Sequence, residues 1–513
     1  MIGFLVIVAL FTGFLEADDI TCPDISQISI KDGVTGSIPK GATSMVNFGK
    51  GTKCTFIFQV PTGFAVQLKI SLYYPVSTTT FYDYFKFDYF YIASGADQHV
   101  EWYMGEEDLL VIFSTPSGNL TFYADYSYVD VSGYTQVIKK TGEYFNSTLE
   151  AGKYYTVRGA AGDTVTYNLA RRTAYEDPTI SNVFMFDGPD ISTASYIGRL
   201  SQWTKLPSYF ESSTNNFTFL NLYGTSSDTF ILGNDFSVIN SLPQYNVDII
   251  TPENLTTGIF HNRNLRDDDA YYTFICDGCD SFYIDGLTFV DRNPQASPGY
   301  GYLLVSGMAP TQGLAPVLNY TYSTTTNMSL PQLIPSSMAT FHSYKSNIYF
   351  LMSTTSNSSF YTPQNRKTRS VSSPTLWNPA ADPNFDYTFS DPVKMFNFSI
   401  NLESVQLVDD GDTLLVEVAT TDGDMSLRNT YSKISLMNVG VSGVGCYLNL
   451  KYSGGKNSQV IVSFEEIEYR NPYRGSYDYC NNYSTLYNKF NCLYYSSSNL
   501  YSNLYSTYNP GNL

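Results

Sequence analysis

Strand-like segments separated by turn residues follow one another along nearly the whole chain. No segment beyond the first 17 residues has the 3.6-residue repeat of an amphipathic helix. Residues 54–60 and 65–72 are two such segments, with the turn signal Pro61-Thr62-Gly63 between them. Aromatic residues, mostly Tyr, make up 16% of the chain, and they favour strands together with the β-branched residues. The sequence therefore predicts an all-β protein.

A chain of 513 residues exceeds what a single hydrophobic core usually organises, so we expect several domains. Residues 183–186 read as a strand that leads into a turn at Asp187-Gly188-Pro189, and similar patterns recur at intervals of about 110 residues. The predicted domains are residues 18–140, 141–250, 251–356 and 382–470. The polar residues 357–381 are interpreted as a linker or long loop, and the Tyr/Asn/Ser-rich residues 471–513 as a disordered tail.

Residues 1–17 contain an apolar run from Ile2 to Leu15, followed by the small residue Ala17. The run is too short to span a bilayer and is typical of a secretory signal peptide, although its start has no Lys or Arg. No later stretch is apolar over the length that a membrane helix needs. We therefore expect a secreted, extracellular protein without a transmembrane segment.

Nine Asn-x-Ser/Thr sequons agree with secretion, and an occupied sequon must lie on the surface because the glycan is bulky. The formal net charge of −18 argues against nucleic acid and anionic membranes as partners, because an acidic surface repels both. The candidate glycosylation sites are Asn119, Asn146, Asn216, Asn254, Asn319, Asn327, Asn357, Asn397 and Asn482.

Three stretches of the first predicted domain resemble a known family. Residues 54–66 read C-x-F-x-F-x-V-P-x-G-F-x-V, residues 88–95 read DYFYIASG, and residues 119–127 read NLTFYADYS. Together with the leader and the early Cys22-Pro23, these stretches are similar to the nematode CUB-like domain family over residues 22–140. The turn at Asp187-Gly188-Pro189 resembles the corresponding turn of CUB domains, which are extracellular antiparallel sandwiches used for binding.

The resemblance implies three or four tandem CUB-like antiparallel β-sandwiches of the jelly-roll type, followed by the tail. It implies a non-enzymatic protein that binds an extracellular protein or glycan and takes part in the pathogen response of a nematode as an innate immune effector. The alternative is a structural component of the extracellular matrix or cuticle that is crosslinked through its Tyr-rich tail. The fold alone does not decide between these functions.

Many CUB domains hold Ca²⁺ through one Glu and two Asp residues, because this hard cation needs several oxygen ligands. In the first domain Asp88 and Asp125 fall at the two Asp positions, and Thr80 falls at the Glu position, near which Asp83 is the available acid. The resemblance thus implies a Ca²⁺ site of Asp83, Asp88 and Asp125. The alternative, which we favour, is that these acids lie in ordinary solvated turns.

The seven cysteines predict disulfides in an oxidising compartment. The C-x-x-C at residues 276–279 has neither the βαβ context of a redox motif nor the second ligand pair of a zinc site. One cysteine, Cys446, is left over in a predicted strand, as a buried free thiol or as the partner in an intermolecular disulfide. The expected pairs are Cys22–Cys54, Cys276–Cys279 and Cys480–Cys492.

Catalysis has little support in the sequence. None of the three histidines, His99, His261 and His342, has a telling context, and there is no His-Glu-x-x-His motif, nucleophile elbow with credible partners or phosphate loop. We therefore predict that the protein is not an enzyme and that it has no cofactor apart from the Ca²⁺ considered above. Arg366-Lys-Thr-Arg369 matches a minimal convertase site in the predicted linker, and processing there and a chance match both stay open.

Overall fold

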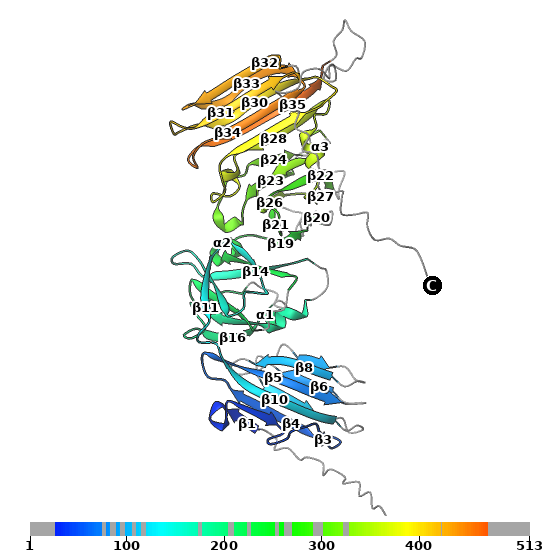
Figure 1. Cartoon of the computed structure of the whole chain (residues 1–513), viewed down its shortest axis with the longest axis vertical. Helices are drawn as coiled ribbons and strands as arrows, with labels where there is room; N and C mark the ends of the chain where they lie inside the picture. Colours follow the sequence, from blue (N-terminus) through cyan, green and yellow to red (C-terminus); the bar gives the residue numbers. More distant parts are fainter. Residues whose placement is uncertain are drawn as a thin grey trace, which may run out of the picture. The chain divides into compact units, whose positions relative to one another are not determined.

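The computed structural model describes residues 26–73, 78–82, 89–92, 98–104, 109–113, 120–172, 177–203, 210–222, 227–251, 256–260, 269–290, 301–321, 328–421 and 423–469. Strands dominate these residues, and the three α-helices among them are four or five residues long, which confirms the all-β prediction (Figure 1). The chain divides into two compact units, Met1–Ser237 and Val238–Leu513. The predicted signal peptide and tail lie outside the described residues.

The first unit begins with a sandwich of two sheets, of order β1-β4-β9-β6-β7 and β2-β10-β5-β8, and β3 also pairs with β10. Phe58 of β4 packs against Leu68 of β5 and Phe122 of β10 in the core between the sheets. The strands are β1 (Ser26–Ser29), β2 (Thr35–Ile38), β3 (Val46–Phe48), β4 (Lys53–Gln59), β5 (Phe64–Tyr73), β6 (Thr78–Tyr82), β7 (Tyr89–Ile92), β8 (Gln98–Met104), β9 (Leu109–Phe113) and β10 (Leu120–Asp130).

The second sandwich of this unit has sheets of order β11-β13-β17-β15-β16 and β12-β18-β14. Gly188, in the turn after β15, has a φ of 145°, and a Cβ there would approach the Cβ of Ala194 to 2.7 Å. The elements are β11 (Thr135–Lys140), β12 (Tyr144–Asn146), β13 (Lys153–Arg158), β14 (Val165–Arg171), β15 (Val183–Asp187), β16 (Ser195–Arg199), α1 (Leu200–Trp203), β17 (Asn216–Asn221), β18 (Thr229–Asp235) and α2 (Phe236–Asn240).

A hydrophobic cluster joins these two sandwiches. Ala65 and Val131 of the first pack with Phe184, Tyr196 and Leu220 on the outer face of the five-stranded sheet of the second. Only residues 131–134 connect β10 to β11. The contact between the two sandwiches is therefore apolar, and it includes Val131 of the short segment that connects them.

The second unit begins with a third sandwich, whose sheets have the order β19-β21-β26-β23-β24 and β20-β27-β22-β25. Phe274 of β21 and Phe350 of β27 meet edge to face in its core, 5.1 Å apart. The strands are β19 (Tyr245–Ile250), β20 (Thr256–Phe260), β21 (Asp269–Cys276), β22 (Phe282–Val290), β23 (Tyr302–Gly307), β24 (Leu318–Thr321), β25 (Gln332–Ile334), β26 (Met338–Tyr344) and β27 (Asn347–Ser353).

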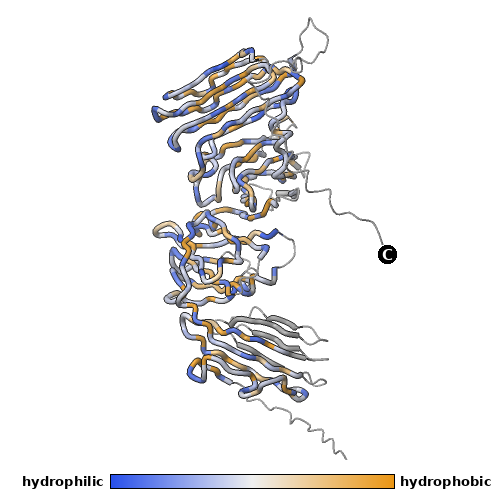
Figure 2. The backbone as a smooth tube through the Cα atoms, in the orientation of Figure 1, coloured by the Kyte–Doolittle hydropathy of each residue, from blue (hydrophilic) through white to orange (hydrophobic). Residues whose placement is uncertain are grey.

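The fourth sandwich has two four-stranded sheets, of order β28-β35-β30-β33 and β29-β34-β31-β32. Apolar and polar residues alternate along its strands (Figure 2), so that one side of each sheet faces the core. The elements are α3 (Asn357–Tyr361), β28 (Lys367–Ser372), β29 (Phe385–Ser390), β30 (Phe396–Gln406), β31 (Thr413–Ala419), β32 (Met425–Ser432), β33 (Ser435–Gly445), β34 (Tyr447–Ser453) and β35 (Gln459–Glu468).

One strand order underlies all four sandwiches. If the eight strands of the fourth are numbered from β28, one sheet has the order 1-8-3-6 and the other 2-7-4-5, which is an eight-stranded jelly roll. The third sandwich repeats this order from β20, and the first repeats it from β2 when β3, which pairs with β10 beside β2, is left out of the count. The second repeats it from β12, with α1 following β16 in the chain where the sixth strand would come. Each of the first three adds one earlier strand, β1, β11 or β19, which pairs in parallel with the second strand of the eight.

These extra strands change the predicted boundaries. β11 lies within the first predicted domain, residues 18–140, but pairs with β13 of the second sandwich. β19 likewise lies within residues 141–250 but pairs with β21 of the third. The linker predicted at residues 357–381 contains α3 and β28, and β28 is an edge strand of the fourth sandwich. No helix among the described residues is long and apolar enough to cross a membrane.

Candidate functional site

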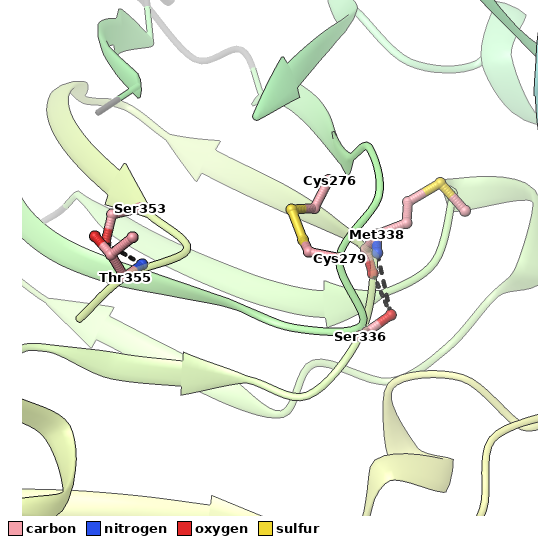
Figure 3. Close-up of a disulfide and its surroundings, with 6 residues drawn as sticks. All are labelled: Cys276, Cys279, Ser336, Met338, Ser353 and Thr355. Atoms are coloured by element: carbon pink, nitrogen blue, oxygen red, sulfur yellow. Dashed lines mark hydrogen bonds between the residues drawn. A yellow bond between two sulfur atoms is a disulfide. The ribbon is translucent and has the colours of Figure 1, made fainter. Parts of the chain in front are cut away.

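The C-x-x-C motif forms a structural disulfide. Cys276, the last residue of β21, is bonded to Cys279, as predicted, and the two Cα atoms lie 5.6 Å apart (Figure 3). Cys276 is buried in the core of the third sandwich, and Cys279 packs against that core. The backbone N–H of Cys276 donates to the carbonyl of Ser337, which ties the turn to the start of β26. The disulfide therefore closes a turn at the edge of the core.

Cys54 and Cys446 are also bonded in disulfides, with partners outside the described residues. The prediction that Cys446 is a free thiol is therefore wrong, and a bond to another molecule stays a prediction. Cys480 and Cys492 lie outside the described residues, so their predicted pair stays a prediction. The pair Cys22–Cys54 stays a prediction.

The structure describes only one of the three residues predicted to hold Ca²⁺. Asp83 and Asp88 lie outside the described residues. Asp125, on β10, is exposed and accepts a hydrogen bond from the hydroxyl of Tyr123, and this bond raises the pKa of Tyr123. Among the described residues no group of three His, Cys, Asp or Glu side chains is arranged to hold a metal. The Ca²⁺ site stays a prediction.

The last residue of the basic stretch that resembles a convertase site, Arg369, is buried, whereas Arg366 is exposed. Arg369 lies on β28 and is 1% exposed, with its Nε 2.8 Å from Oε1 of Glu466 on β35 and a 2.8 Å hydrogen bond to the carbonyl of Thr362. Burial raises the pKa of Glu466, although the charge of Arg369 opposes the shift. The interpretation as an exposed linker is wrong, because the positive charge is neutralised by a residue 97 positions further along the chain.

Aromatic side chains gather on the outer face of the five-stranded sheet of the third sandwich. Tyr271 on β21, Tyr302 on β23, and His342 and Tyr344 on β26 form what we call the aromatic face. All four are half-buried, whereas their neighbours along the strands, such as Phe341, belong to the core. The period of two along a strand therefore turns these four rings outwards.

The four rings form a continuous set across three strands. Tyr271 and His342 are cross-strand partners, and their rings stack with centroids 4.3 Å apart and an interplanar angle of 6°. Tyr302 meets His342 edge to face at 5.7 Å and stacks on Tyr344 at 4.8 Å. Offset and edge-to-face contacts of this kind hold aromatic rings in fixed orientations.

Charged groups border the aromatic face. Nε2 of His342 lies 2.9 Å from Oδ1 of Asp269, and Nζ of Lys345 lies 5.0 Å from the centroid of the Tyr344 ring. Burial, followed by the nearby charge of Asp269, raises the pKa of Tyr271 to about 12 and also raises that of Tyr302. Both phenols therefore stay protonated at neutral pH and can donate hydrogen bonds. Flat apolar rings beside hydroxyl donors and a carboxylate suit a ligand that is apolar on its faces and polar at its rim, such as a sugar ring.

The sequence did not indicate the aromatic face. His342 was assigned no role, because its neighbours Phe341 and Ser343 gave it no telling context. The alternation of residues along β26 indicates that His342 points away from the core. Its partner Tyr271, however, lies 71 positions earlier in the chain. Only the register of β21, β26 and β23 brings these rings together.

The sequons differ in how their asparagines are placed. Asn319 on β24 is exposed, whereas Asn146, Asn216 and Asn397 are half-buried. Asn357 is the first residue of α3. The remaining sequons lie outside the described residues: Asn119, Asn254, Asn327 and Asn482.

Several solved structures show a distant similarity to this chain. The CUB1-EGF-CUB2 domains of rat MASP-1 are 12% identical, with a TM-score of 0.17, over 40% of this chain and 99% of that one. A protein from a structure titled "The Triple Jelly Roll Fold and Turret Assembly in an Archaeal Virus" is 9% identical, with a TM-score of 0.15, over 83% of this chain and 84% of that one. These TM-scores are too low to indicate function, so the jelly-roll order rests on the strand pairing itself.

The family comparison covers the first sandwich. No curated protein matches the chain. Residues 17–132 match the family described as CUB-like domain, in agreement with the resemblance of residues 22–140. CUB-like domains are typically extracellular binding modules. The chain therefore contains a CUB-like domain, which lies at residues 17–132.

Proposed function

We propose that this protein is a secreted, non-enzymatic binding protein that recognises carbohydrate through the aromatic face of its third sandwich. The observation that carries the proposal is the set of four rings in contact on an outer sheet face, with Asp269 beside it. Tyr271 stacks on His342, Tyr302 stacks on Tyr344, and Tyr302 meets His342 edge to face. The CUB-like domain at residues 17–132 supports the extracellular binding class.

The chemistry of this face favours a neutral sugar. The C–H groups of a pyranose ring pack on the negatively polarised face of an aromatic ring, and sugar hydroxyls pair with carboxylates and phenols. A nucleic acid or another polyanion is disfavoured by the net charge of −18. A microbial cell-wall polysaccharide meets these conditions, and it fits the role in pathogen response that the resemblance to nematode proteins implies.

The structural alternative has less support. It rested on the Tyr-rich tail, which lies outside the described residues, and on an unpaired Cys446. Cys446 is disulfide-bonded, so it is not the free cysteine on which the alternative relied. A matrix component crosslinked through the Tyr-rich tail stays the alternative, and the aromatic face favours the binding function over it.

Co-sedimentation of the full chain with insoluble polysaccharides tests the proposal. The probes are chitin, yeast β-glucan, mannan and bacterial peptidoglycan, and the variant is Tyr271→Ala. We expect the wild type to bind at least one probe and Tyr271→Ala to bind it at least about tenfold more weakly, which is the effect of losing one ring stack and its apolar contact. Asn449→Ala is the matched control, because Asn449 lies on the corresponding outer face of the fourth sandwich.

Two results would contradict the proposal. The first is no binding of the wild type to any of the four probes. The second is equal binding of Tyr271→Ala and wild type. Circular dichroism of each variant would show that the sandwiches are still folded.

A further inference from the structure

Asn319 occupies a position on the third sandwich that suits a glycan. Its neighbours on β24, Leu318 and Tyr320, are buried in the core, so Asn319 points outwards from the same sheet that carries the aromatic face. It is exposed, and Thr321 completes the sequon Asn-Tyr-Thr. Among the described strands β24 is at the edge of this sheet.

Strand register places Asn319 beside the aromatic face. Asn319 pairs with Leu304 of β23, and Leu304 pairs in turn with His342 of β26. Thr321 pairs with Tyr302, so Asn319 and Tyr302 are diagonal neighbours on one face. Diagonal neighbours in an antiparallel pair are about 7–8 Å apart. The first sugar on Asn319 therefore reaches both Leu304 and the ring of Tyr302.

Asn146 is a sequon asparagine whose side chain, unlike the outward-pointing Asn319, is held by hydrogen bonds within the fold. Its Nδ2 donates a 2.8 Å hydrogen bond to the carbonyl of Ser227, and its Oδ1 accepts one of 2.8 Å from the backbone of Thr148. Glycosylation joins Nδ2 to the anomeric carbon of an oligosaccharide donor linked to a lipid pyrophosphate. The C–O bond to the pyrophosphate breaks, the lipid pyrophosphate leaves, and the amide loses one proton. At Asn146 the glycan would replace one of the two Nδ2 hydrogens and would have to fit where Nδ2 contacts the carbonyl of Ser227.

We propose that Asn319 carries an N-linked glycan whose first sugar packs on Leu304 and Tyr302 and restricts access to the aromatic face. The proposal rests on the secreted route in the proposed function, because only that route exposes the chain to the glycosylation enzymes. The chain's own glycan would then occupy the edge of the surface that binds carbohydrate from outside.

Occupancy is measured on the full chain secreted from eukaryotic cells. Peptide N-glycosidase in H₂¹⁸O converts a glycosylated Asn to ¹⁸O-labelled Asp, which mass spectrometry locates. We expect the label at Asn319 and not at Asn146. Thr321→Ala removes the sequon and the label, and the matched variant Thr321→Ser keeps both. An unlabelled Asn319 in the wild type would overturn the proposal.

A thermal double-mutant cycle tests the packing of the sugar. Loss of the glycan through Asn319→Gln, which leaves the direct neighbour Thr321 of Tyr302 unchanged, lowers the Tm of the third sandwich by about 2 °C or more relative to the wild type. The same comparison in a Tyr302→Ala background gives a markedly smaller shift, because the partner ring is gone. Equal shifts in both backgrounds would show that the glycan does not contact Tyr302, and the proposal would fail.

Polysaccharide binding separates this inference from the proposed function. We expect Thr321→Ala to bind the polysaccharide probes several-fold more tightly than Thr321→Ser, because the edge of the face is then free. Unchanged binding would overturn the restriction of access. If neither variant binds any probe while the thermal coupling is present, the proposed carbohydrate ligand is wrong and the contact between glycan and Tyr302 stands.

Discussion

The sheet β21-β26-β23-β24 of the third sandwich and the sheet β29-β34-β31-β32 of the fourth hold the same place in the jelly-roll order, and their outer faces differ in chemistry. The third carries the aromatic face. The fourth carries what we call the charged face, where Lys451 pairs with Asp386 at 2.9 Å and Arg428 with Glu417 at 3.4 Å. The shared order fixes which positions point outwards, and the residues at those positions decide whether the face binds or stays solvated.

The second sandwich shows a third use of the same face. There Phe184, Tyr196 and Leu220 are buried against Ala65 and Val131 of the first sandwich. The outer face of this sheet packs against the first sandwich in the second sandwich. In the third sandwich it is a candidate binding surface, and in the fourth it is a charged surface in contact with water. Fold similarity alone would not distinguish these three uses.

The largest expected effect on stability concerns the cores of the third and fourth sandwiches, which differ as their outer faces do. The core of the third sandwich is apolar, whereas the fourth includes the buried pair of Arg369 and Glu466. Glu466→Ala should destabilise the fourth sandwich by about 3–5 kcal/mol, because it leaves a buried guanidinium without its counter-ion. Hydrogen exchange of the amides of β28 and β35 measures the loss.

Glu465→Ala is the control for that experiment, since Glu465 is the exposed neighbour of Glu466 on the same strand. An equally small effect of both substitutions would mean that the buried pair does not hold β28 on the sheet.

A smaller effect is expected at Asp412, which holds the loops of the fourth sandwich. Burial raises the pKa of Asp412, but hydrogen bonds from Ser458 and from the backbone of Gly455 outweigh it, so the pKa is lowered overall. A lowered pKa in the folded state gives stability that is present above the unfolded value of about 3.9 and is lost as the pH falls below it.

Asp412→Asn should therefore cost about 1–3 kcal/mol at neutral pH and flatten the decline of Tm between about pH 5 and pH 2. Thermal melts across this range measure both effects. Asp410→Asn serves for comparison, because the Asp410 side chain is 85% exposed beside Lys433. An unchanged pH profile in Asp412→Asn would remove this carboxylate as the cause.

The smallest effect is expected on the charged face. Lys451→Ala should change the free energy of unfolding by about 0–1 kcal/mol, because an exposed ion pair gains little in water. Raising the salt concentration should reduce even that difference through screening. Polysaccharide binding should stay at the wild-type level. Weakened binding in Lys451→Ala, measured by the same co-sedimentation, would break the contrast between the charged and aromatic faces.

Much of the strand pattern could be predicted from the sequence. The strands expected at residues 54–60, 65–72 and 183–186 are found as β4, β5 and β15, with ends shifted by at most one residue. Local residue preferences and turn signals were sufficient for these, because each strand has a core-facing side and Gly, Pro or Asn at its ends. The short parallel strands β11 and β19 were missed as starts of sandwiches, because nothing local shows which sandwich a strand joins.

The sites depend on contacts between residues distant in the sequence. Arg369 was assigned to a linker because the residues around it are polar, but Glu466 of β35 pairs with it. His342 gained its role from Tyr271 and Tyr302 on two other strands. Neither pairing has a local signal, so sequence reasoning could place the strands and not the sites that they build.

The parallel pairing of β11 with β13 determines where the chain can be cut so that each sandwich keeps all of its strands. A fragment that ends at residue 140 carries a strand of the next sandwich, and a fragment that begins at residue 141 leaves the edge of β13 bare. Bare edges invite pairing with other chains and aggregation. A gene duplication or an engineered truncation therefore succeeds only if its breakpoint falls before Thr135, where the first strand of the following sandwich begins.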